Sequence, residues 1–506
     1  MFFLQAPALL SIFLWITIEL YGWKLRKRNR IRRRELLHDL GHKEGDNKTV
    51  LGFFHPYCNA GGGGERVLWT AIAHVQRTKP NVVSVVYSGD TDATKKEILG
   101  KVKARFNIEL DESHLDFVFL KSRSWVEDSA WPRLTLLGQS LGSIYLAWEA
   151  MTQLIPDLYI DTMGYAFTFH VVSLLGKVPI GAYVHYPTIS TDMLERVKAR
   201  KRWITNQDNI SSSAVLSQAK LLYYRVFMYY YAMSLRTASF LMVNSTWTKE
   251  HIDAILGYSN LVLDILNLLP PLVFLKLFTS SNAPETATIV YPPCDTKEIS
   301  LFSLDNRGRV ILSLAQFRPE KDHTSQIQAF HQFLETYPQY KTEKNVRPRL
   351  VLIGGARNEG DITRVDRLRG LVGELGIEEY VEFVVNAPYS TVLEWLSKAS
   401  IGLSTMVDEH FGIYIVEYMA AGVIPVTHAS GGPLKDIVVP LNNEITGYHA
   451  KTPAEYADAF HQVFSLAAEE ELGMRRRART WAVQTFSEAE FEREWDKSGW
   501  DRYVKP

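Results

Sequence analysis

The sequence predicts an α/β protein with two Rossmann-like lobes that face a cleft, preceded by one N-terminal transmembrane helix. Short apolar runs alternate with amphipathic helical stretches from Lys48 onward, which is typical of a mostly parallel sheet. This alternation stops near Pro292-Pro293 and then starts again, which indicates a second lobe. The segment from Phe2 to Trp23 is nearly all apolar, which predicts the membrane helix.

The N-terminal segment carries further signs of membrane attachment. Residues 1–34 contain eight Lys and Arg residues against one acidic residue, and all eight follow the apolar run. We therefore predict a transmembrane anchor and a basic juxtamembrane run over 1–34, with Met1 in the lumen and the body in the cytosol. A cleaved signal peptide is the alternative, but the charges follow the apolar run and no small-residue cleavage site is present.

Composition limits the function classes. The chain has 506 residues, 46% of them hydrophobic, which suffices for two or three domains with their own cores. Formal net charge is zero and the body has no basic stripe, which argues against a nucleic-acid partner. Two cysteines, Cys58 and Cys294, argue against a disulfide framework, and no Cys/His cluster has the spacing of a metal site.

The two lobes and the C-terminal segment are predicted from the strand pattern. The first lobe covers 48–293 and begins with the strand and loop "TVLGFFHPY". The second lobe covers 306–470, and its predicted strands lie at 309–317, 349–355, 380–386, 399–405 and 423–429. Residues 471–506 are predicted as helices with aromatic anchors that cross back to the first lobe. Loops at the carboxyl ends of the strands are expected to line the cleft.

One apolar segment does not fit this pattern. Residues 261–278 are interrupted by Asp264, Asn267 and Pro270-Pro271. A second membrane span is one interpretation. A core helix followed by a loop that dips into the membrane agrees better with the polar interruption and the double proline.

A glycine run marks the first lobe. Gly61, Gly62, Gly63 and Gly64 lie between a predicted strand and a predicted helix. Four glycines allow a ligand to approach the main chain at a helix N-terminus, where N–H groups attract anions such as a diphosphate. The spacing differs from the G-x-G-x-x-G dinucleotide fingerprint, which disfavours NAD. A flexible surface turn is the alternative.

Charged residues mark the second lobe. Arg318 and Lys321 follow its first strand, where two cations suit a pyrophosphate. Glu409 lies in a loop after the strand 399–405, and Glu417 lies in the helix that follows. These carboxylates could accept bonds from hydroxyls at either side of a pyrophosphate, while amides of Phe411, Gly412 and Ile413 meet its oxygens. Alternatively, Glu409 caps the helix and Glu417 is a solvated surface residue.

These motifs together resemble a known family. Glu-x7-Glu in "EHFGIYIVEYMAAGVIPV", "FRPEK" upstream of it and the glycine-rich first loop resemble the retaining glycosyltransferases of family 4, which have the GT-B fold. The stretches "HPYCNAGGGGERVLW", "VHYPTIS", "NSTWTKEHI", "YPPCD" and "STMVDEHFGI" resemble the alpha-1,2-mannosyltransferases of asparagine-linked glycosylation in the endoplasmic reticulum. The resemblance covers Lys48 to about Pro506.

The resemblance implies a reaction and its partners. It implies transfer of two successive mannoses, the fourth and the fifth, from GDP-mannose to a dolichol-diphosphate-linked oligosaccharide at the endoplasmic reticulum membrane. Other mannosyltransferases of the pathway are candidate partners. No cofactor is implied, and we expect a metal-independent enzyme. Alternatives are another family 4 transferase acting on a lipid-linked acceptor, a non-catalytic nucleotide-sugar-binding scaffold, and a two-lobed epimerase.

The resemblance also implies residue roles. Glu409 and His185 would act on the donor sugar as catalytic residues, and Glu417 would hold the ribose. Arg318 and Lys321 would hold the diphosphate, beside the amides of 411–413, and the loop Gly61–Gly64 would admit the diphosphate or the acceptor. Tyr414 departs from the family pattern, because a small residue is expected there.

Overall fold

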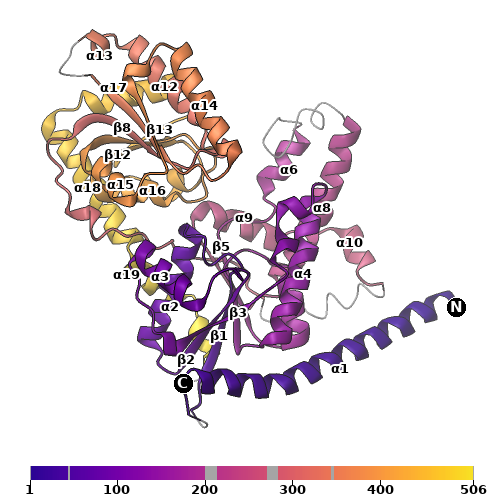
Figure 1. Cartoon of the computed structure of the whole chain (residues 1–506). Helices are drawn as coiled ribbons and strands as arrows, with labels where there is room; N and C mark the ends of the chain where they lie inside the picture. The colour runs from indigo at the N-terminus through magenta and orange to yellow at the C-terminus, as the bar shows by residue number, and fades with distance from the viewer. Residues whose placement is uncertain (1, 44–45, 200–213, 270–282, 343–346, 505–506) are drawn as a thin grey trace. The chain divides into compact units, whose positions relative to one another are not determined.

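The computed structural model describes residues 2–43, 46–199, 214–269, 283–342 and 347–504, and the chain divides into two compact units (Figure 1). Unit 1 comprises residues 1–244, 248–290 and 492–506. Unit 2 comprises residues 245–247 and 291–491. Each unit is built on its own parallel sheet, which confirms two Rossmann-like domains. The predicted domain limits and the predicted cleft between the lobes stay predictions.

The sheet of unit 1 has the strand order β3-β2-β1-β4-β5-β6-β7 within the described residues, and its paired strands are parallel. Its inner strands read as continuous apolar runs because helices cover both faces of such a sheet. The strands are β1 (Thr49–Phe54), β2 (Val82–Ser88), β3 (Leu115–Phe119), β4 (Leu158–Asp161), β5 (Ile180–Val184), β6 (Phe240–Val243) and β7 (Thr288–Ile289).

The helices associated with unit 1 connect these strands or flank them. They are α1 (Phe2–Asp39), α2 (Gly63–Thr78), α3 (Lys95–Phe106), α4 (Thr135–Gln153), α5 (Thr168–Val171), α6 (Thr191–Lys198), α8 (Ala214–Leu235), α9 (Thr246–Leu256) and α10 (Leu261–Leu266). Helix α10 covers the start of the 261–278 segment, and its Leu261 is exposed. Residues 270–282, and with them most of the predicted membrane-dipping loop, lie outside the described residues.

Helix α1 is held against the rest of unit 1 by the basic half that we predicted as a juxtamembrane run. Arg26 donates to the Leu175 carbonyl at 2.8 Å, and Asn29 exchanges two hydrogen bonds of 2.8 Å with the backbone of Ile155. In Figure 1 the other end of α1, toward the N-terminus, projects away from the sheet of unit 1. Within the described residues, no helix is both long and apolar enough to span a bilayer. The predicted single-pass anchor is therefore not confirmed.

The sheet of unit 2 has the order β10-β9-β8-β11-β12-β13 within the described residues, again with parallel pairs. Its strands are β8 (Gly308–Leu314), β9 (Arg349–Gly354), β10 (Val381–Val385), β11 (Ala399–Ser404), β12 (Ile424–His428) and β13 (Tyr448–Ala450). Its helices are α12 (His323–Thr336), α13 (Gln339–Thr342), α14 (Glu359–Glu374), α15 (Tyr389–Lys398), α16 (Ile413–Ala421), α17 (Pro453–Phe464) and α18 (Ala468–Phe486).

The last helix, α19 (Glu488–Lys497), leads the chain out of unit 2, and residues 492–506 belong to unit 1. Trp495 is fully buried there and stacks on Phe53 of β1 with ring centroids 6.5 Å apart. His74 of α2 bonds the Asp496 carboxylate at 2.9 Å. The C-terminal segment is thus part of the core of unit 1.

A buried arginine, Arg475, connects α18 to the sheet of unit 2 through hydrogen bonds. Arg475 is 1% exposed, donates to the carbonyls of Gly422 and Ser400, and pairs with Glu471 one turn earlier. A guanidinium in such a place is tolerated because each of these acceptors compensates its lost hydration.

We expect Arg475→Met to destabilise unit 2 by about 3 kcal/mol, because the change leaves buried carbonyls and the Glu471 carboxylate without their donor. Arg476→Met is the matched control, since Arg476 is exposed on the same helix. Chemical denaturation of both variants measures the difference. Equal stabilities would show that the buried network contributes nothing.

Candidate active site

The predicted site residues fall in both units. Arg318, Lys321, Glu409, 411–413 and Glu417 belong to unit 2, whereas Gly61–Gly64 and His185 belong to unit 1. The two groups are described in turn.

In unit 2 the predicted residues lie on loops at the carboxyl ends of β8 and β11. These strands are neighbours and parallel, so their following loops meet at one edge of the sheet. Thr405, directly after β11, donates its hydroxyl to the carbonyls of Lys321 and Asp322 at 3.1 and 3.0 Å. The loop that carries the cations is therefore tied to the loop that carries Glu409.

Lys321 and Glu409 form an ion pair with each other. Their side chains are 19% and 10% exposed, so both charges have lost most of their water. A buried charge is stable only when a partner compensates its lost hydration. Here the Lys321 ammonium and the Glu409 carboxylate compensate each other. The structure thus brings together the predicted phosphate ligand and the predicted sugar ligand.

Tyr414 completes this group, at a position where we expected a small residue. Its hydroxyl lies 3.0 Å from Glu409 Oε2 and 2.7 Å from Ser404 Oγ. The Lys321 ammonium lies over its ring, 4.9 Å from the centroid. Burial, together with the nearby Glu409 charge, raises the pKa of Tyr414 well above its ordinary value, so the hydroxyl stays protonated and donates to the carboxylate.

Arg318 is more accessible. Its side chain is 42% exposed and lies 4.0 Å from the Glu320 carboxylate, a contact that contributes little in water. It stands at the start of the short turn Pro319–Lys321, three residues before Lys321. An anion bound by Lys321 would therefore lie beside the loop that also carries the Arg318 guanidinium.

The loop from Glu409 into α16 depends on glycines. Gly412 caps α16 with φ +104°, a conformation that L side chains rarely adopt. A Cβ at Gly431 would lie 2.2 Å from the Glu409 carbonyl oxygen, and the Gly432 amide donates to that oxygen at 2.8 Å. The 430–433 turn thus packs directly on the Glu409 loop.

The start of α16 presents backbone amides, as predicted for 411–413. The first amides of a helix have no acceptor within it, which makes this end attractive to anions. The Phe411 side chain is buried and stacks on Tyr291 with centroids 5.8 Å apart, so it serves packing and only its backbone belongs to the site. The structure places Glu409 in the loop and Glu417 half-buried in α16, in agreement with the sequence.

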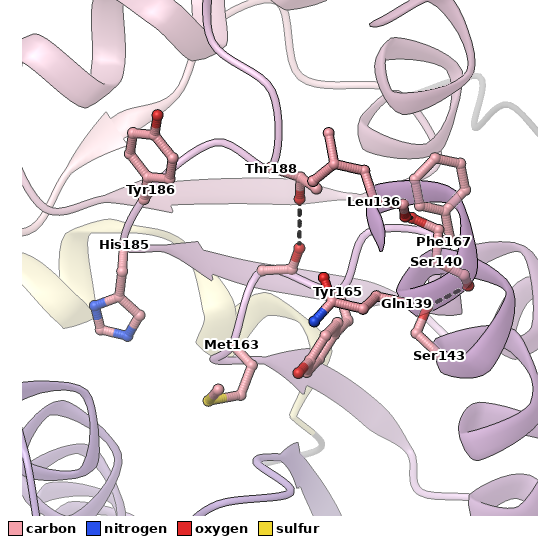
Figure 2. A pocket seen from close by; sticks show the side chains of 11 residues that line it. Leu136, Gln139, Ser140, Ser143, Met163, Tyr165, Phe167, His185, Tyr186 and Thr188 are labelled. Carbon is pink, nitrogen blue, oxygen red and sulfur yellow. Dashed lines mark hydrogen bonds between the residues drawn. The ribbon is translucent and has the colours of Figure 1, made fainter. Parts of the chain in front are cut away.

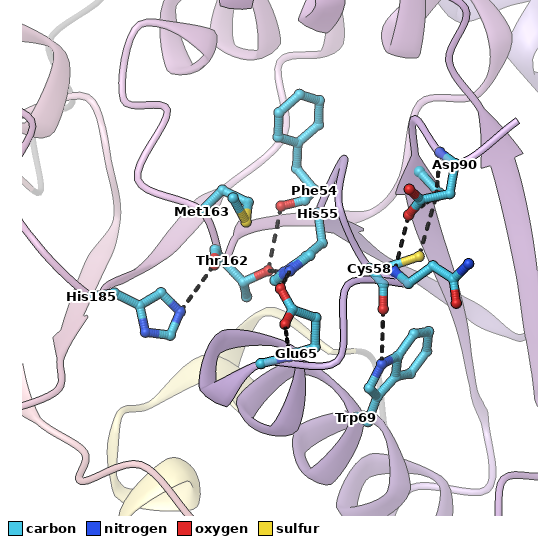
Figure 3. A network of polar contacts seen from close by, with 12 residues as sticks. Phe54, His55, Cys58, Glu65, Trp69, Asp90, Thr162, Met163 and His185 are labelled. Atoms are coloured by element: carbon cyan, nitrogen blue, oxygen red, sulfur yellow. Dashed lines mark hydrogen bonds and ion pairs between the residues drawn. The ribbon is translucent and has the colours of Figure 1, made fainter. Parts of the chain in front are cut away.

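In unit 1 the glycine run starts α2 with a buried capping box. Gly62 is the N-cap, and its amide donates to the Glu65 carboxylate. Glu65 also contacts His55 Nε2 at 3.3 Å, and His55 Nδ1 lies 2.8 Å from the Thr162 hydroxyl (Figure 3). Burial raises the pKa of Glu65, but the bonds from His55 and Gly62 outweigh it and hold that pKa below its ordinary value.

His185 lies at the end of this network. Its Nε2 is 3.1 Å from the Thr162 carbonyl, and a Cβ at Gly64 would lie 3.5 Å from the same nitrogen (Figure 3). The predicted histidine and the predicted glycine loop are therefore neighbours. His55, Glu65 and Thr162 were missed from the sequence, although the Glu65 spacing from Gly62 is that of a capping box.

A cavity of about 260 Å³ opens beside His185 (Figure 2). Its walls are α4, the 163–167 loop after β4 and the 185–188 loop after β5. Sequence patterns did not reveal it, because its residues come from three separate segments. In neither unit do three or more His, Cys, Asp or Glu side chains of the described residues gather as a possible metal site.

Comparisons with known proteins cover both units. The family model described as "ALG11 mannosyltransferase N-terminus" matches residues 48–256, and that described as "Glycosyl transferases group 1" matches residues 296–481. A Homo sapiens protein named "GDP-Man:Man(3)GlcNAc(2)-PP-Dol alpha-1,2-mannosyltransferase" is 45% identical, over 89% of this chain and 86% of its own. A Dictyostelium discoideum protein of the same name is 43% identical, over 92% and 86%.

The solved structure of Anabaena Alr3699/HepE in complex with UDP and glucose has the same fold. The TM-score is 0.53 at 14% sequence identity, over 89% of this chain and 99% of that one. At this identity the likeness bears on the fold alone.

The buried capping box generates a pH-dependent prediction. Because Glu65 has a lower pKa when folded, its carboxylate stabilises unit 1 above pH 4.5, and this stabilisation is lost as the pH falls through the folded pKa. Glu65→Gln should therefore cost about 1–2 kcal/mol at pH 7 and much less below pH 4. Thermal melting at both pH values measures it.

Glu97→Gln is the matched control, because Glu97 holds the same capping-box position on α3 but is exposed. A smaller change is expected there. A Glu65→Gln penalty that did not depend on pH would show that the carboxylate charge is irrelevant.

Proposed function

This chain belongs to the family of GDP-Man:Man(3)GlcNAc(2)-PP-Dol alpha-1,2-mannosyltransferases, and we propose that it transfers mannose from GDP-mannose to a dolichol-diphosphate-linked oligosaccharide. The acceptor carries three mannoses, and the enzyme adds the fourth and the fifth. The observation that carries the proposal is the buried Lys321–Glu409 pair beside the N-terminus of α16.

Unit 2 binds the donor in this proposal. A sugar nucleotide carries anionic oxygens and sugar hydroxyls close together. The diphosphate replaces Glu409 as the partner of Lys321, with Arg318 and the first amides of α16 as further donors. The mannose hydroxyls then replace Lys321 as the partners of the Glu409 carboxylate. Glu417, about one turn into the same helix, receives the ribose hydroxyls.

The bond that breaks joins the mannose anomeric carbon to a phosphate oxygen. Positive charge develops on the sugar and negative charge on the leaving GDP. Lys321, Arg318 and the helix N-terminus stabilise that negative charge, which is electrostatic catalysis. The acceptor hydroxyl attacks from the side of the leaving group, and its proton passes to the departing phosphate. The anomeric configuration is thereby retained.

A covalent glycosyl-enzyme through Glu409 is the competing mechanism. Two donors, Lys321 and the Tyr414 hydroxyl, bind the Oε2 atom of Glu409. The Tyr414 hydroxyl, which stays on Glu409 when the diphosphate takes Lys321, draws electron density from the carboxylate and reduces its nucleophilicity, which favours the direct displacement. His185 keeps its proposed catalytic role, and its bond to the Thr162 carbonyl orients the imidazole.

The membrane is the proposed site of action, on its cytosolic side at the endoplasmic reticulum. A dolichol-linked acceptor resides in a bilayer, and α1 carries a run of exposed apolar residues that suits attachment to one. These are Leu9, Leu10, Ile12, Phe13, Leu14, Trp15, Ile16, Ile18, Leu20, Tyr21 and Trp23. Both cysteines are free thiols, as in a cytosolic protein.

The reaction is tested with detergent-extracted protein, GDP-mannose and a lipid-diphosphate trimannosyl acceptor. We expect products one and two mannoses longer, with GDP released in step. In the proposed machinery, Lys321, Arg318 and the helix amides neutralise the diphosphate, which is the role a divalent cation would have, so transfer should persist in EDTA. Complete loss in EDTA, restored by a divalent cation, would contradict the metal-independent mechanism. Release of GDP without a longer product would contradict transfer itself.

Alanine at Glu409, Lys321 or Arg318 should lower transfer by about 10²–10³-fold, because each removes a group that binds the developing charge or orients the sugar. Lys341→Ala and Glu335→Ala are matched controls, since they break another Lys–Glu pair of unit 2 remote in sequence. Initial rates at saturating donor measure the effect. Near-normal rates in the Glu409, Lys321 and Arg318 variants would show that these residues do not form the active site.

Replacing Leu10, Phe13 and Ile16 by Ser should weaken vesicle binding by at least about tenfold, because membrane affinity scales with the apolar area that is buried. The three side chains are exposed, so folding should not suffer. Leu301→Ser, at an exposed leucine of unit 2, is the control. Sedimentation with phosphatidylcholine–phosphatidylinositol vesicles measures binding, and unchanged sedimentation would exclude α1 as the attachment.

A further inference from the structure

We propose that the cavity beside His185, called here the α4 cavity, binds one neutral hexose of the acceptor, at the end that receives the new mannose. This inference rests on the proposed function and assigns its acceptor sugar to specific residues. The cavity has a volume of about 260 Å³ and lies wholly within unit 1 (Figure 2).

The first argument is the position of the α4 cavity. It lies at the carboxyl ends of β4 and β5, where parallel α/β sheets bind their ligands. Asp161, the last residue of β4, stabilises the loop that follows it. Its carboxylate accepts hydrogen bonds from the amides of Met163 and Gly164 at 3.0 and 2.9 Å. Thr188 ties the second loop to the first through a 3.3 Å bond to the Gly164 carbonyl. The walls are therefore held in place by the protein itself.

The second argument is the chemistry of the lining. None of the residues that line the α4 cavity is Lys, Arg, Asp or Glu. A diphosphate would need cations, which this lining lacks. The lining instead combines aromatic rings, among them Tyr165 and Phe167, with amide, hydroxyl and imidazole groups. A hexose matches this combination, because it presents C–H groups on its faces and hydroxyls around its edge.

The third argument is the state of the polar side chains. The hydroxyls of Ser140 and Ser143 donate to carbonyls within α4, both at 2.7 Å, so their oxygen atoms can serve a ligand only as acceptors. Gln139 donates its Nε2 to the Val126 carbonyl at 3.0 Å, which orients its amide. Oε1 is then the atom that Gln139 can offer to a sugar hydroxyl. Burial raises the pKa of Tyr165, so its hydroxyl remains protonated and able to donate.

The fourth argument is His185, which belongs both to the α4 cavity and to the proposed catalytic group. Its Nε2 is fixed by the Thr162 carbonyl, and the same nitrogen lies next to Gly64 of the glycine loop. A hexose in the cavity would thus place a hydroxyl near the His185 imidazole. We infer that the α4 cavity selects which acceptor hydroxyl attacks.

The matched pair Gln139→Leu and Gln153→Leu tests the assignment. Both glutamines lie on α4 and donate to a backbone carbonyl, Gln153 to Phe119 at 3.1 Å, but only Gln139 lines the cavity. Gln139→Leu should raise KM for the lipid-linked acceptor at least about tenfold, because a site built to bind a hydroxyl discriminates strongly when its partner is removed. KM and Kd for GDP-mannose should not change.

Equal acceptor KM values in the two variants would overturn the proposal. A rise in KM for GDP-mannose in place of the acceptor KM would also overturn it, because the cavity would then belong to the donor. Gln153→Leu reports any general effect of a lost side chain on α4.

A binding measurement separates failure of this inference from failure of the proposed function. Saturation-transfer NMR with methyl α-D-mannopyranoside is done on the full-length Glu409→Ala protein, in which the proposed donor-mannose site is removed. A signal is expected that adding Gln139→Leu abolishes and adding Gln153→Leu retains. This pattern without any mannose transfer by the unmodified protein would leave the α4 cavity as a hexose site and refute the reaction. A signal that survives in the Glu409→Ala/Gln139→Leu double variant, or that is absent in Glu409→Ala alone, would refute the α4 cavity as the hexose site.

Discussion

The ion pair between Lys321 and Glu409 is the interaction on which the candidate active site depends. Both charges are largely removed from water, so neither is stable there without the other or a substitute. The substitute has to bring an anion for the ammonium and hydrogen-bond donors for the carboxylate at the same time. A nucleotide sugar does both, whereas a simple phosphate or a simple sugar does only one. Tyr414 keeps the Glu409 carboxylate oriented while the ligand replaces Lys321, because the Tyr414 hydroxyl donates to that carboxylate. The Lys321 ammonium lies over the Tyr414 ring.

Unit 1 repeats this arrangement with different residues. In both units a helix begins directly after a parallel strand and its loop, glycines allow close approach to its first amides, and a buried carboxylate fixes the loop. In unit 1 that carboxylate is Glu65, and its partner is His55. The difference is in what the carboxylate binds. Glu65 accepts from its own helix cap and thus has a structural role, while Glu409 accepts from Tyr414 and pairs with Lys321, which a ligand can replace.

The strands of unit 2 were predicted closely from the sequence. The predictions 349–355 and 399–405 correspond to β9 at Arg349–Gly354 and β11 at Ala399–Ser404. Short, mostly apolar runs between turn residues leave few other places for a buried parallel strand. The loop position of Glu409 and the helix position of Glu417 followed from the same pattern. The role of the basic part of α1 could not be predicted, because a run of Arg and Lys residues does not reveal that backbone carbonyls of another segment will accept its hydrogen bonds.

The sequence by itself determined the two-lobed α/β class, the family and the residues that carry charge or glycine at the strand ends. These are local properties, since periodicity, motif spacing and residue type can each be read within a few turns of chain. Only the tertiary structure decided that Lys321 pairs with Glu409 and Tyr414, that His55 and Thr162 connect Glu65 to His185, and that α4 closes a cavity over two loops. Those contacts join residues up to about a hundred positions apart. The packing of the folded chain brings these residues within bonding distance, and no local sequence pattern indicates this packing.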